Sequence, residues 1–372
     1  MSRITQHEMA RKLGVSRSTV AAALNPDSPI RLKKATRDRV VRAAREWGYR
    51  PDLHARIMRG GRSGLIGMLH FGGLLQVAAE RAYHAAASIR ASGYGVVPAD
   101  LSWSADSLEA ACASLLDARV EGVVVAGLND ARAVTLLESL RRAGLPLVSL
   151  SGNPLPWAPH FRGDARSAFR DLARHLLDRG HRRLALLAEE NGAYAWATEE
   201  RMRGLGDTLR PDGGRIVSRF GPGGRTARAE AILVSASAAA GDDAPADPFD
   251  PFQAGARGVR RLLRASGRPT AILCANDNLA LGVLQACREA GLSVPGDIAV
   301  TGYDDTAAGR IGGIPLTTVR QPSQAMAERA VSVLLDLLRA PKKGAKPTSR
   351  LELFPCQVLL RASSDAPAPR PA

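Results

Sequence analysis

Hydrogen-bonding side chains gather in one short stretch near the start of the chain. Arg17 follows Ser16, a favoured helix N-cap residue, and opens a segment whose apolar spacing predicts a helix over about 17–24. A guanidinium carries a planar fork of N–H donors that matches the O6 and N7 acceptors of guanine. Ser16, Thr19 and Asn25 carry side chains suited to phosphate oxygens. This combination at the beginning of a short helix favours contact with double-stranded DNA.

The positive charge of the chain is concentrated around this segment. Residues 1–62 hold 15 Lys and Arg and 5 Asp and Glu, a net charge of +10 out of +15 for all 372 residues. A basic module on a nearly neutral body indicates a polyanionic partner. A solvated basic surface, or a small helical bundle that docks another protein, would show the same charge, and both alternatives stay open at this point.

Three short helices are expected to position these side chains. Thr5 and Glu8 have the spacing of a capping box and predict a first helix, and Gly14 supplies the turn that follows it. With the helix over 17–24 and a third over about 34–47, the pattern is that of a helix-turn-helix. In the second helix we expect one face to pack inward and the other to face a DNA groove. The inward side chains are Val20, Ala23 and Leu24, and the outward ones are Arg17, Ser18, Ala21 and Ala22.

Beyond residue 64, apolar runs alternate with stretches of helical spacing. Examples of the runs are 65–69, 120–126, 183–188 and 270–275. Strands of this kind are buried on both faces, as in a parallel sheet covered by helices. The number of units predicts two doubly wound α/β lobes, and ligands bind such sheets at the carboxyl ends of the strands. The expected fold class is therefore an all-α helix-turn-helix domain followed by a two-lobed α/β domain with parallel sheets.

Sequence signals for enzymatic chemistry are missing. There is no GxGxxG after a strand, no phosphate-binding GKS or GKT loop and no GxSxG elbow, and the seven histidines lack metal-ligand spacing. We therefore expect no catalytic residue, no cofactor and no metal. The N-terminus is polar and basic, and no stretch approaches the ~20 apolar residues of a membrane span. A cytoplasmic location without a membrane partner is expected.

Several motifs along the chain resemble those of the lac repressor family of bacterial transcription regulators. The resemblance begins in the helix-turn-helix and continues through both predicted lobes in the family's order, from about Ile4 to Val319. The matching segments are Ile4-Thr5, Glu8-Met9-Ala10, Leu13-Gly14-Val15-Ser16, Thr19-Val20, Leu24-Asn25, Thr36-Arg37, Gly48-Tyr49-Arg50-Pro51, Arg201-Met202-Arg203-Gly204, Asn276-Asp277, Ala280-Leu281-Gly282, Gly302-Tyr303-Asp304-Asp305 and Leu316-Thr317-Thr318-Val319.

The resemblance implies a sequence-specific transcription regulator that binds a two-fold symmetric operator as a homodimer, and we expect a repressor. Its operator affinity would be controlled by a small effector, a sugar or sugar derivative, bound between two lobes similar to periplasmic sugar-binding proteins. Such an effector must bind two lobe arrangements with different affinity if it is to change DNA binding. The alternative is a solute-binding protein of the sugar-binding type without a DNA function.

The resemblance also implies which residues bind DNA and effector. Met58 would lie on a hinge helix, where it either parts a base step in the minor groove or packs in the dimer. Ala21-Ala22 replaces the family's usual Ser-Arg, so Ala22 offers only a methyl to a thymine and the operator half-site is expected to differ. The implied DNA contacts are Thr5, Ser16, Arg17, Ser18, Thr19, Ala22, Asn25, Tyr49, Ala55 and Met58, and the implied effector contacts are Asp164, Arg201, Asn276 and Asp304.

The same reasoning divides the chain into domains. The expected domains are a helix-turn-helix domain (1–50), a hinge helix with linker (51–64), an effector-binding and dimerisation domain (65–361) and a disordered tail (362–372). The expected lobes are a first lobe at about 65–160 and 321–350 and a second lobe at about 161–319 and 351–361. The segment 241–251 is rich in Pro and Asp and predicts a loop insertion.

Overall fold

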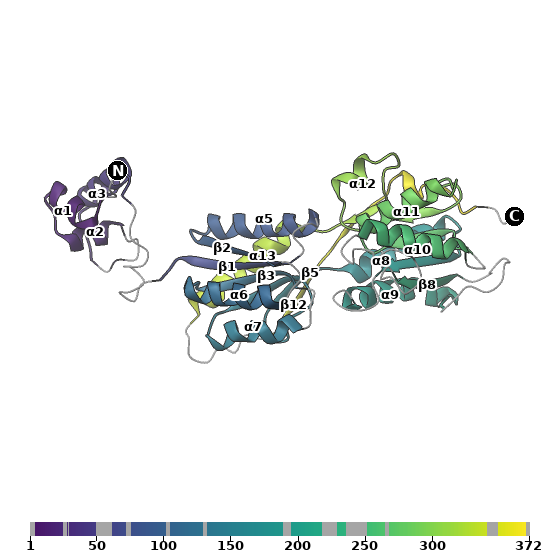
Figure 1. Cartoon of the computed structure of the whole chain (residues 1–372), viewed down its shortest axis with the longest axis horizontal. Coiled ribbons are helices and arrows are strands. Elements are labelled where there is room, and N and C mark those ends of the chain that lie inside the picture. The colour runs from purple at the N-terminus through teal and green to yellow at the C-terminus, as the bar shows by residue number, and fades with distance from the viewer. Residues whose placement is uncertain are drawn as a thin grey trace. The chain divides into compact units, whose positions relative to one another are not determined.

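The structure is a computed structural model, shown in Figure 1. The residues that it describes are 4–24, 28, 30–49, 62–71, 76–101, 105–128, 132–188, 195–217, 229–235, 251–264, 268–340 and 349–369. The chain forms two compact units that divide between Ser63 and Gly64. Three predicted DNA contacts, Asn25, Ala55 and Met58, lie outside the described residues. The predicted loop insertion lies outside them too, except for its last residue.

The described part of the first unit contains the helices α1 (Gln6–Leu13), α2 (Arg17–Leu24) and α3 (Lys34–Glu46). The predicted capping box is confirmed, because Thr5 Oγ1 accepts a hydrogen bond from the Glu8 N–H and the Glu8 carboxylate accepts one from the Thr5 N–H. Gly14 ends α1 at a φ of 62°, where a side chain would be strained. The three helices share one core, made of Met9, Ala10, Val20, Ala23, Val40, Ala43 and Ala44.

The first lobe of the second unit is a 6-stranded parallel sheet in the order β12-β5-β4-β3-β1-β2. Its strands are β1 (Leu65–Phe71), β2 (Gly95–Leu101), β3 (Gly122–Leu128), β4 (Leu147–Gly152), β5 (His160–Gly163) and β12 (Leu351–Phe354). Helices cover both faces, which gives this lobe two apolar cores. One core involves α5 (Gln76–Ala91) and α13 (Ser323–Arg339), and the other involves α6 (Ala105–Asp117) and α7 (Arg132–Arg142).

The second lobe is a 5-stranded parallel sheet in the order β10-β9-β6-β8-β7. Its strands are β6 (Arg183–Ala188), β7 (Arg215–Ile216), β8 (Glu230–Ser235), β9 (Ala271–Cys274) and β10 (Ala299–Thr301). Its helices are α8 (Ala165–Asp178), α9 (Ala195–Leu209), α10 (Pro251–Arg264), α11 (Asp277–Glu289) and the short α12 (Ala307–Ile311). The fold class predicted from the sequence is confirmed.

Two glycines of the sequence motifs let helices approach closely in this lobe. A Cβ on Gly204 of α9 would lie 2.2 Å from the carbonyl oxygen of Arg166 on α8. A Cβ on Gly282 of α11 would lie 1.9 Å from the carbonyl oxygen of Phe252 on α10. Real side chains never come this close, so both helix pairs depend on glycine at these positions.

Three chain segments connect the lobes. β5 leads into α8, β11 (Thr318–Arg320) leads into α13, and β12 leads into β13 (Gln357–Leu359). β11 and β13 pair with each other as an antiparallel ribbon. The predicted lobe boundaries need a correction here, because 161–163 and 351–354 belong to the first lobe. They are neighbouring parallel strands of its sheet, β5 and β12, and this pairing is non-local.

The prediction of a disordered tail from residue 362 is wrong as far as residue 369. Ala362–Ser364 form a 3-10 turn, and both Ser363 and Ser364 are fully buried. Ser363 Oγ donates a 2.6 Å hydrogen bond to the carbonyl of Val300, and Ser364 Oγ lies 2.8 Å from Nε2 of His175. These hydroxyls satisfy polar atoms of the second lobe, so small polar residues pack there instead of facing solvent.

Candidate DNA and effector sites

The first turn of α2 presents an exposed group of polar side chains. Arg17 and Ser18 are exposed. Ser16 caps the helix, because its Oγ accepts a 3.0 Å hydrogen bond from the N–H of Thr19. Gln6 donates from Nε2 to the Arg17 carbonyl at 3.2 Å, which holds α1 against the start of α2. The backbone of Arg17 is thus fixed while its side chain is exposed, as reading a base edge requires.

The other described DNA-contact candidates have structural roles. The hydroxyl of Thr5 takes part in the α1 capping box. Tyr49 is half-buried against the helical core, and its N–H donates to the carbonyl of Ala44. The expectation that Ala22 faces outward is wrong, since this residue is only 3% exposed. An alanine methyl extends one bond from the backbone, so neighbouring groups cover it where a longer side chain would pass beyond them.

Exposed cations are numerous in the first unit. They attract a polyanion whatever its sequence. The exposed ones in the described part of the first unit are Arg11, Lys12, Arg17, Arg31, Lys33, Lys34, Arg39, Arg42, Arg45 and Arg62.

In the second unit, Asp304 follows β10 at its carboxyl end and has a strained backbone. Its φ is 114°, a region that side chains rarely adopt. The N–H of Asp304 donates to the carbonyl of Val319, and the N–H of Asp277 donates to the carbonyl of Tyr303, both at 2.8 Å. These bonds hold the strained residue from both sides. Strain maintained in this way is typical of ligand-binding positions.

Asp304 is half-buried in a polar environment. Burial raises the pKa of its carboxyl to about 7, and the charge of Arg81 acts in the opposite direction. Gln321 donates from Nε2 to Asp304 Oδ1 at 2.7 Å. A carboxyl with this pKa changes its charge near neutral pH, so a bound donor or cation shifts its ionisation.

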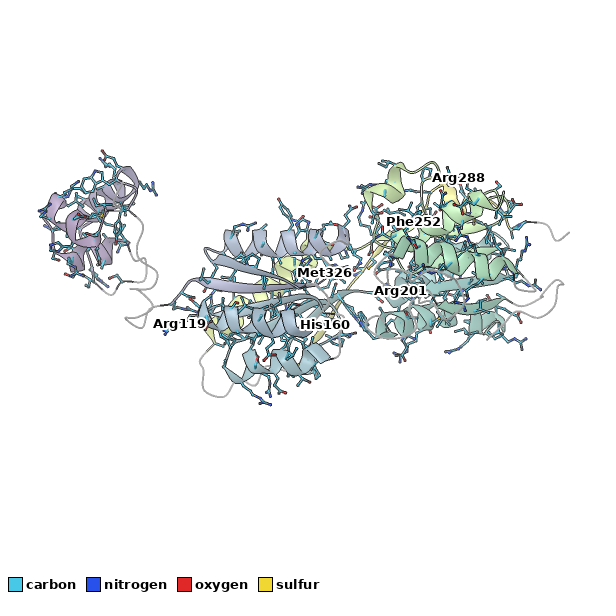
Figure 2. All side chains as sticks on the ribbon, in the orientation of Figure 1. Arg119, His160, Arg201, Phe252, Arg288 and Met326 are labelled. Atoms are coloured by element: carbon cyan, nitrogen blue, oxygen red, sulfur yellow. The ribbon has the colours of Figure 1, made fainter. Side chains whose placement is uncertain are left out.

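Arg201 of α9 reaches the same place as Asp304. Its Nη2 donates to the carbonyl of Ala275 at 3.1 Å, and its guanidinium carbon lies 5.2 Å from the ring centroid of Tyr303. Figure 2 shows Arg201 at the end of the second lobe that faces the first lobe. The structure therefore brings together two of the four predicted effector contacts, although they are far apart in the sequence.

The other two predicted effector contacts, Asn276 and Asp164, cap helices. Asn276 Oδ1 accepts a 2.9 Å hydrogen bond from the N–H of Leu279 at the start of α11. The Asp164 carboxylate accepts bonds from the N–H and the Oγ–H of Ser167 at 3.0 and 2.7 Å. Both side chains have further hydrogen-bonding capacity, so their contact with an effector stays a prediction.

Contacts between the lobes involve Gln76 and Arg162, which the sequence did not single out. Gln76, at the start of α5, accepts a 3.1 Å hydrogen bond from the N–H of Ala307. The Arg162 guanidinium lies 4.4 Å from the centroid of the Trp196 ring, and its Nη2 lies 3.6 Å from Glu200 Oε2. Their partners are far away along the chain, so no local pattern identifies them.

Arg81 was also missed, although the sequence carries a signal for it. It interrupts the apolar face of α5 that includes Val77, Ala78 and Ala85, and it is itself buried. A charged residue at a core position of an amphipathic helix is rare and points to a functional environment.

Comparison with known proteins agrees with this arrangement. The family model "Bacterial regulatory proteins, lacI family" matches residues 5–52, and the model "Periplasmic binding protein-like domain" matches residues 173–364, more than half of the chain. The HTH-type transcriptional repressor PurR of Proteus mirabilis (strain HI4320) is 28% identical over 372 residues, 98% of each chain. The ribose operon repressor of Escherichia coli (strain K12) is 28% identical over 352 residues, 94% of this chain and 97% of that protein.

The whole architecture matches a solved repressor. The Lac repressor bound to ONPG in its repressed state has a TM-score of 0.74 and 25% identity, and the match covers 97% of this chain and 100% of that chain. Among the residues that the structure describes, no helix is long and apolar enough to cross a membrane. The family consists of DNA-binding regulators and not of enzymes. The chain belongs to the lac repressor family and is a DNA-binding transcriptional regulator with a two-lobed periplasmic-binding-protein-like domain.

Proposed function

We propose that the protein is a repressor that binds a two-fold symmetric operator as a homodimer and changes its operator affinity when a small hydroxylated effector binds between its lobes. The observation that carries the effector part is the convergence of Asp304 and Arg201 of the second lobe with Gln76 and Arg81 of the first. A carboxylate accepts hydrogen bonds from adjacent hydroxyls and a guanidinium donates them, which suits a sugar or sugar derivative. One similar structure is described as a Lac repressor dimer bound to operator.

The proposed DNA contacts fall into two groups. Arg17 and Ser18 contact base edges from the start of α2, since their side chains are exposed there. Ser16 and Thr19 at the start of α2, Thr5 at the start of α1 and Tyr49 after α3 hold the backbone of the duplex. The roles of Asn25, Ala55 and Met58 rest on the family resemblance alone. A protein that acts on operator DNA would work in the cytoplasm, and this location is part of the proposal.

The effector acts in this proposal by selecting one arrangement of the lobes. The bond between Gln76 and Ala307 and the ion pair between Arg162 and Glu200 both join the lobes in the arrangement described. An arrangement with the lobes rotated would have to break or replace them. A ligand that touches Arg81 and Asp304 at once binds the two arrangements with different affinity, and this difference is what moves the equilibrium.

Selection of bound fragments from sheared genomic DNA tests the proposal. Specific binding should survive ~0.15 M salt and yield a two-fold symmetric site. A chain that lacks residues 1–62 should lose DNA retention and keep its ligand binding. Recovery of no specific site, alone or with a panel of sugars and purines, would contradict the proposal.

A further inference from the structure

Arg81 stands in an apolar environment that is unusual for a cation. Only 8% of the surface of Arg81 is exposed to solvent. It is the one charged member of the buried face of α5, whose other members are Val77, Ala78, Ala82, Ala85, Ala86 and Ile89. Removing a guanidinium from water is unfavourable unless partners replace the lost hydration. The question is therefore which group serves as the partner of Arg81.

Among the described residues, Arg81 has a charge interaction with Asp304 but no hydrogen-bond acceptor. In the part of the chain that the structure describes, Arg81 makes no hydrogen bond or ion pair, and its Nε is completely buried. The other cations of the site differ in this respect. Arg162 pairs with Glu200, and Arg201 donates to the carbonyl of Ala275. Nε of Arg81 is thus a buried donor without an acceptor among the described residues.

The position of α5 directs Arg81 toward the effector site. Gln76, five residues earlier in the same helix, contacts the N–H of Ala307, so the first turns of α5 lie against the loop that follows Asp304. The charge of Arg81 is also the largest influence that opposes the effect of burial on Asp304. A second buried donor, Nε1 of Trp196, likewise makes no hydrogen bond to any described residue. The site therefore offers more donors than the described residues satisfy.

The chemistry of these donors selects a class of ligand. A guanidinium carries five N–H donors and no acceptor, and its planar fork matches two oxygens of one carboxylate or phosphate. A neutral sugar hydroxyl offers one oxygen and no charge. We propose that the effector carries an anionic group, a carboxylate or a phosphate, which Arg81 binds while its hydroxyls face Asp304. This inference rests on the proposed function and narrows its effector to hydroxylated acids and phosphate esters.

Matched pairs of ligands test the inference with the full-length protein. The probes are glucose against gluconate and glucose 6-phosphate, and ribose against ribonate and ribose 5-phosphate, each titrated by calorimetry and in operator release. At least one anionic compound should bind about tenfold or more tightly than its neutral counterpart. The carboxylate and phosphate arms show which of the two anions the site prefers.

Substitutions of Arg81 test whether this residue causes the preference for anionic ligands. Arg81→Met should abolish it, Arg81→Lys should keep part of it through charge alone, and the exposed Arg90→Met on the same helix should retain it. Arg81→Met should also raise the thermal midpoint of the ligand-free protein, because it removes a buried cation whose Nε has no hydrogen-bond acceptor among the described residues. This second readout confirms that the variant folds.

Two results would overturn the inference. One is that no anionic compound binds the wild-type protein more tightly than its neutral counterpart. The other is that Arg81→Met keeps the preference. Operator release by a neutral sugar alone would leave the proposed repressor function intact while refuting the anionic effector, so the two failures are distinguishable.

Discussion

Gln321 donates a 2.7 Å hydrogen bond from Nε2 to Asp304 Oδ1, and this bond ties a segment that connects the two lobes to the strained loop after β10. Gln321 lies between β11 and α13, and Val319 of the same segment accepts a bond from the N–H of Asp304. The loop is thus tied twice to one interlobe connection. A rotation of the lobes about this connection changes the surroundings of Asp304, which is the coupling that an effector-controlled regulator needs.

Replacing Asp304 by Asn should stabilise the protein in a pH-dependent way. Burial raises the folded-state pKa of this carboxyl from 3.8 to about 7, so between these values the folded state binds a proton that the unfolded state has lost. Stability from this group is fully present below pH 3.8 and is lost as the pH rises through about 7. Asp304→Asn should therefore gain stability at pH 8, on the order of 2–4 kcal/mol, and little at pH 4.

Thermal and urea unfolding of the wild type and Asp304→Asn across this pH range measures the effect. The same variant should lose its response to effector, because asparagine cannot provide the charge. A stability difference that is constant from pH 4 to pH 8 would show that ionisation of Asp304 does not limit stability.

Asp305 should be essential for the stability of the second lobe. Its carboxylate is 2% exposed and contacts three guanidinium groups, with Arg310 Nη1 at 3.2 Å and the Nη2 atoms of Arg320 and Arg361 at 2.6 Å. Asp305→Ala leaves three neighbouring cations without their shared carboxylate. The expected loss is about 3–5 kcal/mol in the free energy of unfolding.

A matched control for Asp305 is the exposed Asp336, which pairs with Arg339 one helical turn away. Asp336→Ala should change stability by less than about 0.5 kcal/mol. Both variants are compared by urea unfolding at pH 7. Equal stabilities would mean that the three arginines find other partners once Asp305 is removed.

The central strands of the sheets could be predicted from the sequence more directly than the edge strands. β6 is an uninterrupted apolar run in the centre of its sheet, and the strand predicted at 183–188 is confirmed. β2 was not predicted, because Pro98 and Asp100 interrupt its apolar pattern. It is an edge strand of the first sheet, where a missing N–H and a polar side chain are tolerated.

Within the candidate site, only residues that belong to short sequence motifs could be predicted. Arg201 and Asp304 come from short motifs, and the structure brings them together around Tyr303. Gln321 and Arg162 belong to no such motif, and their roles depend on lobe contacts between residues far apart in the chain. Ala22 was placed outward because helical spacing gives the direction of a side chain but not what covers a short one.

Arg17→Ala should weaken operator binding without changing stability. The side chain is exposed at the start of α2 and its guanidinium is the donor best placed for a guanine, so the loss should be about 1–3 kcal/mol, or roughly tenfold to a hundredfold in Kd. The control is Arg288→Ala, which removes one exposed charge from the second lobe (Figure 2). Fluorescence anisotropy with the selected operator measures both. Equal Kd values for the two variants would mean that Arg17 contributes only general charge.

Truncation of the C-terminal segment should destabilise the second lobe. A chain that ends at Arg361 lacks Ser363, whose Oγ accepts a 2.8 Å bond from the N–H of Thr317 and whose N–H donates to the carbonyl of Pro315. It also lacks Ser364, which bonds to His175. Buried groups left without partners cost about 1–3 kcal/mol each, so a loss of at least about 3 kcal/mol is expected.

A chain that ends at residue 369 is the control for this truncation, since it keeps the buried serines and the bond from the N–H of Ala368 to the carbonyl of Arg179. It should unfold at the wild-type temperature, whereas the shorter chain should unfold several degrees lower. Differential scanning calorimetry separates the two. If both truncated chains unfold with the wild type, water replaces the serine hydroxyls at no cost, and the segment covers the lobe without stabilising it.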